Sequence, residues 1–355
     1  MYILYVPKIA KCIILLICTT NYSQNLLYMR LSIGSWNING ITHRIDQSLR
    51  SFKTEDPDFQ AYISKHDIVG ILETKVGAND PINIRGYKSF QISRKKSKNN
   101  RFYGGICVAV KEYIANGITV LKPKEGSESI WVKLDRHFFN ISKDYYVCFV
   151  YVSPDKSGRE FGIDVYDGIV NEIAFYSAKG QCIILGDMNA HTQLEPDHIV
   201  NDENFDDLNL PEDYVPDTPK RRRNCDTSKV NDHGKALLDL CISSGFRILN
   251  GRKIGDLQGK CTYYGPMCKN PTLIDYGLAH NQGLKDIQLF CVQDLSFLSD
   301  HCLIYVQIEV NAKISKLNVE SHIQLSSIPR KYHWENDREQ LFLENLSNSE
   351  TSNKV

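Results

Sequence analysis

The feature that most constrains the fold is a series of short apolar, β-rich runs that recur from about residue 30 to residue 310 of the 355-residue chain. Polar segments separate these runs, and helical patterns are few. The runs are "LSIGSWNI", "DIVGILET", "GGICVAV", "SIWVKL", "YYVCFVYV", "CIILGDM", "FRILN", "TLIDYGLA" and "HCLIYVQIEV". Many strands with few helices predict an α/β (α+β) fold in which packed β-sheets are flanked by helices, and not a simple β-α-β repeat.

Helical spacing of apolar residues occurs in a few segments only. "YDGIVNEIAFYSAKG" and "NDHGKALLDLCISSG" both show it, and the second ends at Gly245, a residue that favours helix termination. A third amphipathic segment, "KYHWENDREQLFLENL", follows a polar linker near the C-terminus. We therefore divide the chain into a leader (1–28), a domain (29–310) and a linker with a C-terminal helix (311–355).

Polar or ionisable side chains stand at the ends of six of the apolar runs. They are Asn37, Glu73, Tyr151, Asp187 with Asn189, Asp275, and Asp300 with His301. In stacked sheets, strand ends lie along one rim, so residues far apart in sequence can converge there. The alternative is that each one caps a strand or a turn, because Asn and Asp favour turns. The turn explanation suffices for any single position, whereas the whole set favours a site.

The residue types in this set indicate a particular chemistry. Carboxylates and amides form a hard-oxygen environment, which suits Mg²⁺ or Mn²⁺ and does not suit zinc. Asp300 beside His301 suggests an imidazole held in one tautomer. Asp187 and Asn189 are two apart, so on an extended chain their side chains would point the same way. With no P-loop, GxGxxG or GxSxG motif in the chain, the set predicts metal-assisted hydrolysis of a phosphoester.

These motifs resemble those of a known family. The segments "SWNING", "GILETK", "VYVSP", "LGDMNA", "LNGRKIGDLQGKCTYYGP", "LIDYGL" and "LSDHCLI" occur in the order found in the endonuclease/exonuclease/phosphatase superfamily. That superfamily includes deoxyribonuclease I and the apurinic endonucleases. More narrowly, the chain is similar to the endonuclease domain of non-LTR (LINE-type) retrotransposons. The resemblance implies a deoxyribonuclease I-like, four-layer sandwich of two packed mixed β-sheets flanked by helices.

The resemblance also implies roles for the residues that carry the chemistry. Asp187 would orient the attacking water, and Asn189 would hold the scissile phosphate. Tyr151 would donate its phenol to the phosphate. Asp275 would pair with His301, whose ring would offset charge in the transition state.

The metal-binding and substrate-binding groups are likewise implied by the resemblance. Glu73 would be the principal metal ligand, assisted by Asn37, with Asp300 supporting the metal side. Asn39 stands where apurinic endonucleases have aspartate, a departure that matches the LINE-type domains. The substrate-binding group would be Asn39, Thr262 and Ser299. Asp155 follows "VYVSP" where apurinic endonucleases have asparagine, which argues against abasic-site specialisation.

Charge and composition bear on partners and compartment. Lysine plus arginine balances aspartate plus glutamate at 42 each, so DNA binding would depend on local basic segments such as "RKKSKNNR" and "KRRR". These segments could equally be solvated loops. The 11 cysteines show no CxxC pair, and several lie in apolar runs, which favours buried free thiols in a reducing compartment.

The N-terminal run "CIILLIC" is shorter than the roughly 20 apolar residues that span a bilayer, and no signal-cleavage pattern follows it. We therefore expect no stable membrane partner. We favour an intracellular, nuclear location over secretion.

The leading hypothesis is a Mg²⁺- or Mn²⁺-dependent DNA endonuclease that leaves 3′-hydroxyl and 5′-phosphate ends. The alternatives are a phosphatase or an RNA nuclease (deadenylase) of the same superfamily, and a DNA-binding relic without activity.

Overall fold

The computed structural model describes residues 26–44, 50–77, 79–93, 102–121, 128–154, 164–200, 217, 221–265 and 270–313. All of these residues belong to one compact unit, Met1–Ile314. The predicted leader, the predicted C-terminal helix and basic residues 94–101 lie outside the described residues.

The first sheet has six strands. Their order is β13 (Ile287–Val292), β14 (Ile304–Lys313), β1 (Leu26–Asn37), β4 (Ile68–Leu72), β6 (Ile106–Lys111) and β5 (Tyr87–Ile92). Strands β1 and β4 pair in parallel, whereas β1 and β14 pair antiparallel, as do β4 and β6. The sheet is therefore mixed, and the ends of β1 and β4 point the same way.

The second sheet also has six strands. Their order is β11 (Phe246–Ile248), β12 (Asp275–His280), β10 (Gly180–Asp187), β9 (Asp144–Tyr151), β8 (Ser129–Leu134) and β7 (Ile118–Val120). Strands β9 and β10 pair in parallel, and β12 runs antiparallel to β10. A short hairpin of β2 (Thr42–Arg44) and β3 (Arg50–Phe52) stands apart from both sheets.

The two sheets pack face to face through apolar side chains. The central strands β4 and β9 are almost continuously buried, as expected for strands covered on both faces. Gly70 in β4 lies against the ring of Phe149 in β9, and a Cβ atom at this glycine would come within 2.1 Å of that ring. The close approach brings the ends of the central strands of both sheets together.

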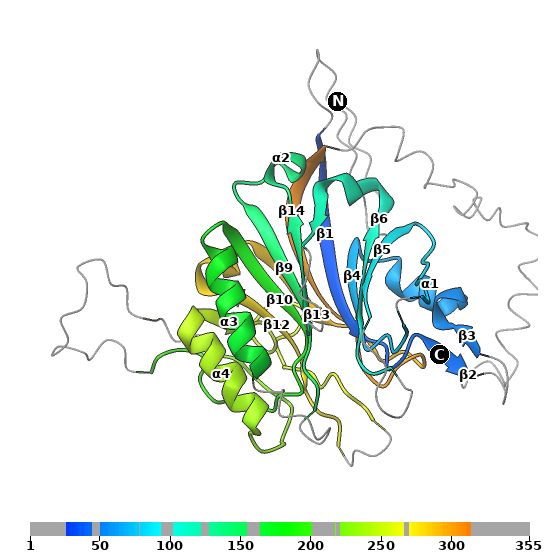
Figure 1. The fold of residues 1–355 in the computed structure, drawn as a ribbon. Coiled ribbons are helices and arrows are strands. Elements are labelled where there is room, and N and C mark those ends of the chain that lie inside the picture. Colours follow the sequence, from blue (N-terminus) through cyan, green and yellow to red (C-terminus); the bar gives the residue numbers. More distant parts are fainter. Residues whose placement is uncertain are drawn as a thin grey trace, which may run out of the picture. The chain divides into compact units, whose positions relative to one another are not determined.

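Helices cover the outer faces of the sheets (Figure 1). Helix α1 (Pro57–Ile63) packs its Phe59 and Ile63 into the apolar cluster on the first sheet. Helices α3 (Asp164–Ser177) and α4 (Asp232–Ser244) pack together on the second sheet. The remaining short helices are η1 (Lys53–Glu55), η2 (Glu112–Gly117), α2 (Arg136–Phe139) and η5 (Asn281–Lys285).

The layers confirm the predicted four-layer sandwich of two mixed sheets and flanking helices. The two helices predicted within the domain are present as α3 and α4, and α4 ends at Gly245 with the left-handed φ of 69°. Helix α1 was not predicted. It begins at Pro57, after Asp56 caps the amide of Asp58.

Two features of the described residues bear on the expectations about compartment. Every cysteine among them is a free thiol, and Cys148 and Cys182 are buried as predicted. Within the same residues, no helix has the length and apolar character needed to cross a membrane.

Candidate active site

The polar residues that follow the apolar runs meet at one end of the sandwich because of strand register. Strand β9 ends at Tyr151 and β10 ends at Asp187, and parallel pairing sets these two residues side by side. Asp275 begins β12, and antiparallel pairing sets it opposite Asp187. In the first sheet, Asn37 ends β1 beside Leu72, the last residue of β4. A residue at the start of an antiparallel strand thus lies at the same edge of the sheet as a residue at the end of a neighbouring parallel strand.

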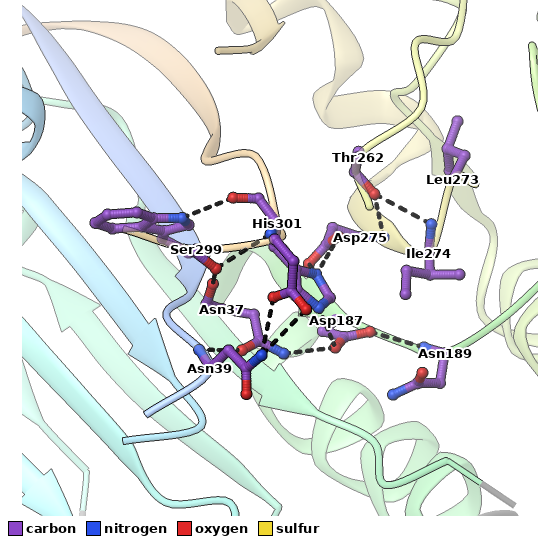
Figure 2. A network of polar contacts seen from close by, with 12 residues as sticks. Asn37, Asn39, Asp187, Asn189, Thr262, Leu273, Ile274, Asp275, Ser299 and His301 are labelled. Atoms are coloured by element: carbon purple, nitrogen blue, oxygen red, sulfur yellow. Dashed lines mark hydrogen bonds and ion pairs between the residues drawn. The ribbon is translucent and has the colours of Figure 1, made fainter. Parts of the chain in front are cut away.

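A direct hydrogen bond joins the two sheets at this rim. The amide nitrogen Nδ2 of Asn37 donates to Oδ2 of Asp187 over 2.8 Å, and both side chains are buried. Figure 2 shows the bond at the centre of a polar network drawn from several elements. The amide that ends β1 is therefore fixed by a carboxylate from the other sheet, while the main chain turns at Gly40 with a φ of 93°.

Asp187, Asp275 and His301 form the core of the network. Nδ1 of His301 lies 3.0 Å from Oδ2 of Asp275, and its Nε2 lies 4.0 Å from Oδ2 of Asp187. One potential ligand atom from each residue lies within 4.8 Å of the others. The imidazole therefore stands between two buried carboxylates, with its Nε2 toward the one that Asn37 holds.

Burial and mutual charge shift the proton affinities of this group. Burial, followed by the negative charge of Asp275, raises the pKa of Asp187 to about 8. Burial by itself lowers the pKa of His301, but Asp275 and then Asp187 outweigh it, so that this pKa rises to about 9. At neutral pH the ring is therefore protonated and can donate from both nitrogens.

Glu73 follows β4 and joins the same end of the molecule. Its carboxylate forms an ion pair with Nζ of Lys75 at 2.6 Å and accepts a hydrogen bond from Tyr151. Burial acts to raise its pKa, yet Lys75, Tyr151 and the charge of His301 together lower it. Glu73 therefore stays ionised at neutral pH, as a ligand for a cation must be.

Asn39 and Asp300 lie at the more exposed side of the site. Nδ2 of Asn39 donates to both carboxylate oxygens of Asp300 at 3.1 Å, and its Oδ1 accepts from Lys75 at 2.5 Å. Its backbone amide donates to Oδ1 of Asn37. Asn39 thus connects two of the residues that the resemblance placed at the metal, Asn37 and Asp300, and reaches the third, Glu73, through Lys75.

The side chain of Asn189 does not follow the extended-chain prediction. The residue adopts a left-handed φ of 47°, and its backbone amide donates to Oδ1 of Asp187 over 3.0 Å. Its Nδ2 donates to the carbonyl of Val152 over 2.6 Å. The prediction that Asp187 and Asn189 point the same way on an extended chain is wrong because the chain turns immediately after β10.

Thr262 and Ser299 support the network through the backbone. Oγ1 of Thr262 accepts the amides of Ile274 and Asp275, which fixes the start of β12. Oγ of Ser299 donates to the carbonyl of Asn37 over 2.6 Å and accepts the amide of His301. Both hydroxyls therefore position neighbours of the acid–histidine group.

Sequence reasoning overlooked two lysines at the site. Lys75 stands in the motif "LETK" but received no role, although it contacts Glu73 and Asn39. Lys53 carries no motif signal, yet it is buried and bonds to carbonyls beside the site.

In the basic segment "KRRR", the side chain of Arg222 turns inward and donates to Thr192 and to the carbonyl of Glu195, so this arginine stabilises the loop.

The donor set fits a divalent cation. Asp187, Asp275 and Glu73 concentrate carboxylates at one rim, and the negative charge of Asp275 adds to burial in raising the pKa of Asp187. A cation would relieve that charge. Carboxylate and amide oxygens are the ligands that Mg²⁺ and Mn²⁺ prefer.

Two mixed sheets with flanking helices and a buried acid–histidine group at their strand ends define the deoxyribonuclease I-like class. A profile of the Endonuclease/Exonuclease/phosphatase family matches residues 34–301. Because the match spans most of the chain, the protein belongs to this family, as the motif resemblance predicted. No curated protein sequence matches the chain.

Three solved structures are similar to the chain at low sequence identity. The endonuclease domain of TRAS1, a telomere-specific non-LTR retrotransposon, is 15% identical, with a TM-score of 0.47 over 79% of this chain and 98% of that one. The 3′ phosphatase NExo from Neisseria, bound to a product DNA hairpin, is 14% identical, with a TM-score of 0.50 over 78% and 99%. The Xenopus laevis APE2 catalytic domain is 16% identical, with a TM-score of 0.56 over 81% and 94%. At such identities the likeness shows the fold alone.

Proposed function

We propose that the protein is a Mg²⁺- or Mn²⁺-dependent DNA endonuclease of the retrotransposon type, which nicks one strand and leaves 3′-hydroxyl and 5′-phosphate ends. One observation carries the proposal. The side chains of Asn37, Asp187, Asp275 and His301, drawn from both sheets, form one buried cluster at the strand ends: Asn37 is hydrogen-bonded to Asp187, His301 to Asp275, and Nε2 of His301 lies 4.0 Å from Asp187. The LINE-type motifs of the sequence favour DNA as the substrate, and DNA would place the protein in the nucleus.

Asp187 would act on the attacking water. Two donors, Nδ2 of Asn37 and the amide of Asn189, fix the orientation of its carboxylate. Burial and the charge of Asp275 raise its pKa, and a cation at the site would favour the ionised form, which can accept a proton from water. The water oxygen would bond to phosphorus while the bond to the 3′-oxygen breaks; the proton of the water would pass to Asp187, and the 3′-oxygen would take up a proton from solvent.

His301 would stabilise charge on the phosphate. Its Nδ1 is bound by Asp275, so the protonated ring is held in one orientation and its Nε2–H remains for a phosphate oxygen. A fixed cationic donor near developing negative charge accelerates phosphoester hydrolysis. Tyr151 would contact the phosphate from the neighbouring strand end, together with Asn189, whose amide has one hydrogen beyond its bond to Val152.

We place the metal ion at Glu73, Asn37 and Asp300. The Asp187–Asp275–His301 group is the other candidate, but Nδ1 of its imidazole is held by Asp275 and the carboxylate of Asp187 is held by Asn37. The ion pair between Lys75 and Glu73 supports this placement, because it shows that a positive charge is bound at Glu73. A divalent ion there would neutralise phosphate charge and stabilise the leaving oxygen.

The test is plasmid nicking by purified protein with Mg²⁺. We expect nicked circles with 3′-hydroxyl ends, no activity in EDTA, and a loss of about 10²-fold or more in Asp187→Ala. The matched control is Asp232→Ala, which removes an exposed carboxylate at the start of α4. Absence of nicking by the unaltered protein, or equal nicking by Asp187→Ala, would reject the proposal. Preference for inositol phosphates or poly(A) in a substrate panel would point to the other activities of the family.

A further inference from the structure

Lys53 is a buried lysine in η1 whose ammonium group is bound by backbone carbonyls. The residue is 8% exposed. Its Nζ donates to the carbonyl of Ile38 over 2.7 Å and to the carbonyl of Leu298 over 2.6 Å. Its backbone amide donates to the carbonyl of Ile41 over 2.7 Å, so the lysine is held at both ends.

The two carbonyls belong to the two segments that carry the exposed side of the active site. Ile38 lies between Asn37 and Asn39 at the end of β1. Leu298 directly precedes the turn of Ser299, Asp300 and His301, which leads into β14. The ammonium therefore joins two segments about 260 residues apart in sequence, from a third segment that contributes no other group to the site.

Burying a lysine at this position is energetically unfavourable, because its charged ammonium loses contact with water. Burial lowers the pKa of Lys53 to about 8, with Asp300 opposing that shift and Lys75 adding to it. An apolar side chain of similar length would be buried at a lower cost, but it would leave both carbonyls without this donor. The two hydrogen bonds to the carbonyls of Ile38 and Leu298 offset the free-energy cost of burying the ammonium, and an apolar side chain could not form them.

We propose that Lys53 is a positioning residue of the active site: its ammonium clamps the Ile38 and Leu298 carbonyls together and so sets the placement of Asn37 relative to His301. The inference rests on the proposed function for its kinetic consequence, but not for the clamp itself. Lys53 does not touch substrate. It acts through the segments that do, alongside Trp36, whose indole donates to the carbonyl of His301 over 2.9 Å.

The kinetic test removes the ammonium and keeps an unbranched apolar side chain that is one atom shorter. In Lys53→Met we expect kcat for plasmid nicking to fall about 10²-fold with little change in KM, because misplaced catalytic groups slow the chemical step more than they weaken DNA binding. Lys53→Arg, which keeps the charge and the donors, should recover part of the rate. If Lys53→Met does not fold, Lys53→Gln takes its place: its uncharged amide is one atom shorter and cannot hold both carbonyls as the ammonium does, so the same loss of kcat is expected.

The matched control is Lys111→Met. Lys111 is also a partly buried lysine, and its Nζ pairs with Asp67 over 3.2 Å at the opposite end of β4 from Glu73. The Lys111→Met variant should have a lower free energy of unfolding and an unchanged kcat. Equal losses of kcat in Lys53→Met and Lys111→Met, or an unchanged kcat in Lys53→Met, would overturn the proposal.

Amide hydrogen exchange tests the clamp without any substrate. Lys53→Met should lose protection in residues 37–41 and 298–302, where the amides of Gly40 and His301 are hydrogen-bonded, while Lys111→Met should not. If the unaltered protein fails to nick DNA, the proposed function falls and the exchange pattern still decides the clamp. Unchanged protection in both segments would overturn it.

Discussion

Two of the histidine–aspartate pairs among the described residues have nearly the same contact distance and very different surroundings. Nδ1 of His301 lies 3.0 Å from Asp275, and Nδ1 of His191 lies 2.8 Å from Asp226. The side chain of His301 is 7% exposed and that of His191 is 24% exposed. The contact distance alone therefore does not distinguish the two pairs.

The carboxylates account for the difference. Asp226 accepts the backbone amides of Ser228 and Leu273 as well as the ring of His191. Burial acts to raise its pKa, but these donors, led by His191, lower it to about 2. Asp275 instead faces a second buried carboxylate, Asp187, across the strand register. A carboxylate surrounded by amides locks a loop, whereas one that faces another carboxylate holds a proton-bearing ring between them.

The largest expected effect separates the two rings. We expect His301→Ala to lower the nicking rate by about 10² to 10⁴-fold, because it removes the positioned cationic donor. His191→Ala should change the rate less than about tenfold, since its ring binds only the structural carboxylate. Single-turnover nicking by both variants measures the contrast. A loss in His191→Ala as large as that in His301→Ala would show that both pairs serve the reaction.

The next effect separates the two carboxylates. Asp275→Asn should slow nicking by about 10²-fold and shift its alkaline limb to lower pH. Loss of that negative charge disfavours the imidazolium, so the pKa of His301 falls from about 9. Asp226→Asn should leave the limb in place. Rate profiles from pH 6 to 10 check the prediction, and identical shifts in both variants would contradict it.

The smallest effect concerns stability in acid. The pKa of Asp226 is lowered in the folded protein from 3.8 to about 2, so its contribution is complete above pH 3.8 and is lost as the pH falls through 2. Because the pair is partly exposed to solvent, we expect a contribution of about 1 kcal/mol. Urea unfolding of Asp226→Asn should show this loss near pH 5, with convergence on the unaltered protein near pH 2. A constant difference across this range would show that the amide contacts, and not ionisation, matter.

The predictable part of the site is the part fixed by strand ends. Asn37, Tyr151 and Asp187 end apolar runs, and the parallel pairing of neighbouring strands necessarily sets such ends together. Asp275 was found in the same way, although it begins its strand. The end of a run in the sequence marks the rim of a sheet whichever direction the strand takes.

The residues that sequence reasoning missed or misplaced depend on turns. Asn189 leaves the extended conformation directly after β10, so its side chain departs from the direction that alternation predicts. Lys53 lies in a short helix with no periodic pattern, and its two partners are backbone carbonyls, which have no residue identity to recognise. Helix α1 is a single short element and gives a correspondingly weak periodic signal.

By itself, the sequence determined the fold class, the family and the set of side chains at the strand ends, because these follow from the alternation of apolar runs and from motifs that lie within single elements. Only the tertiary structure decided that the ring of His301 faces Asp187 as well as Asp275, and that Lys53 is buried beside them. Proton affinity and hydrogen-bond partnership depend on distances between segments that the chain order leaves open. Packing of one sheet on the other sets those distances, as the bond from Asn37 to Asp187 shows.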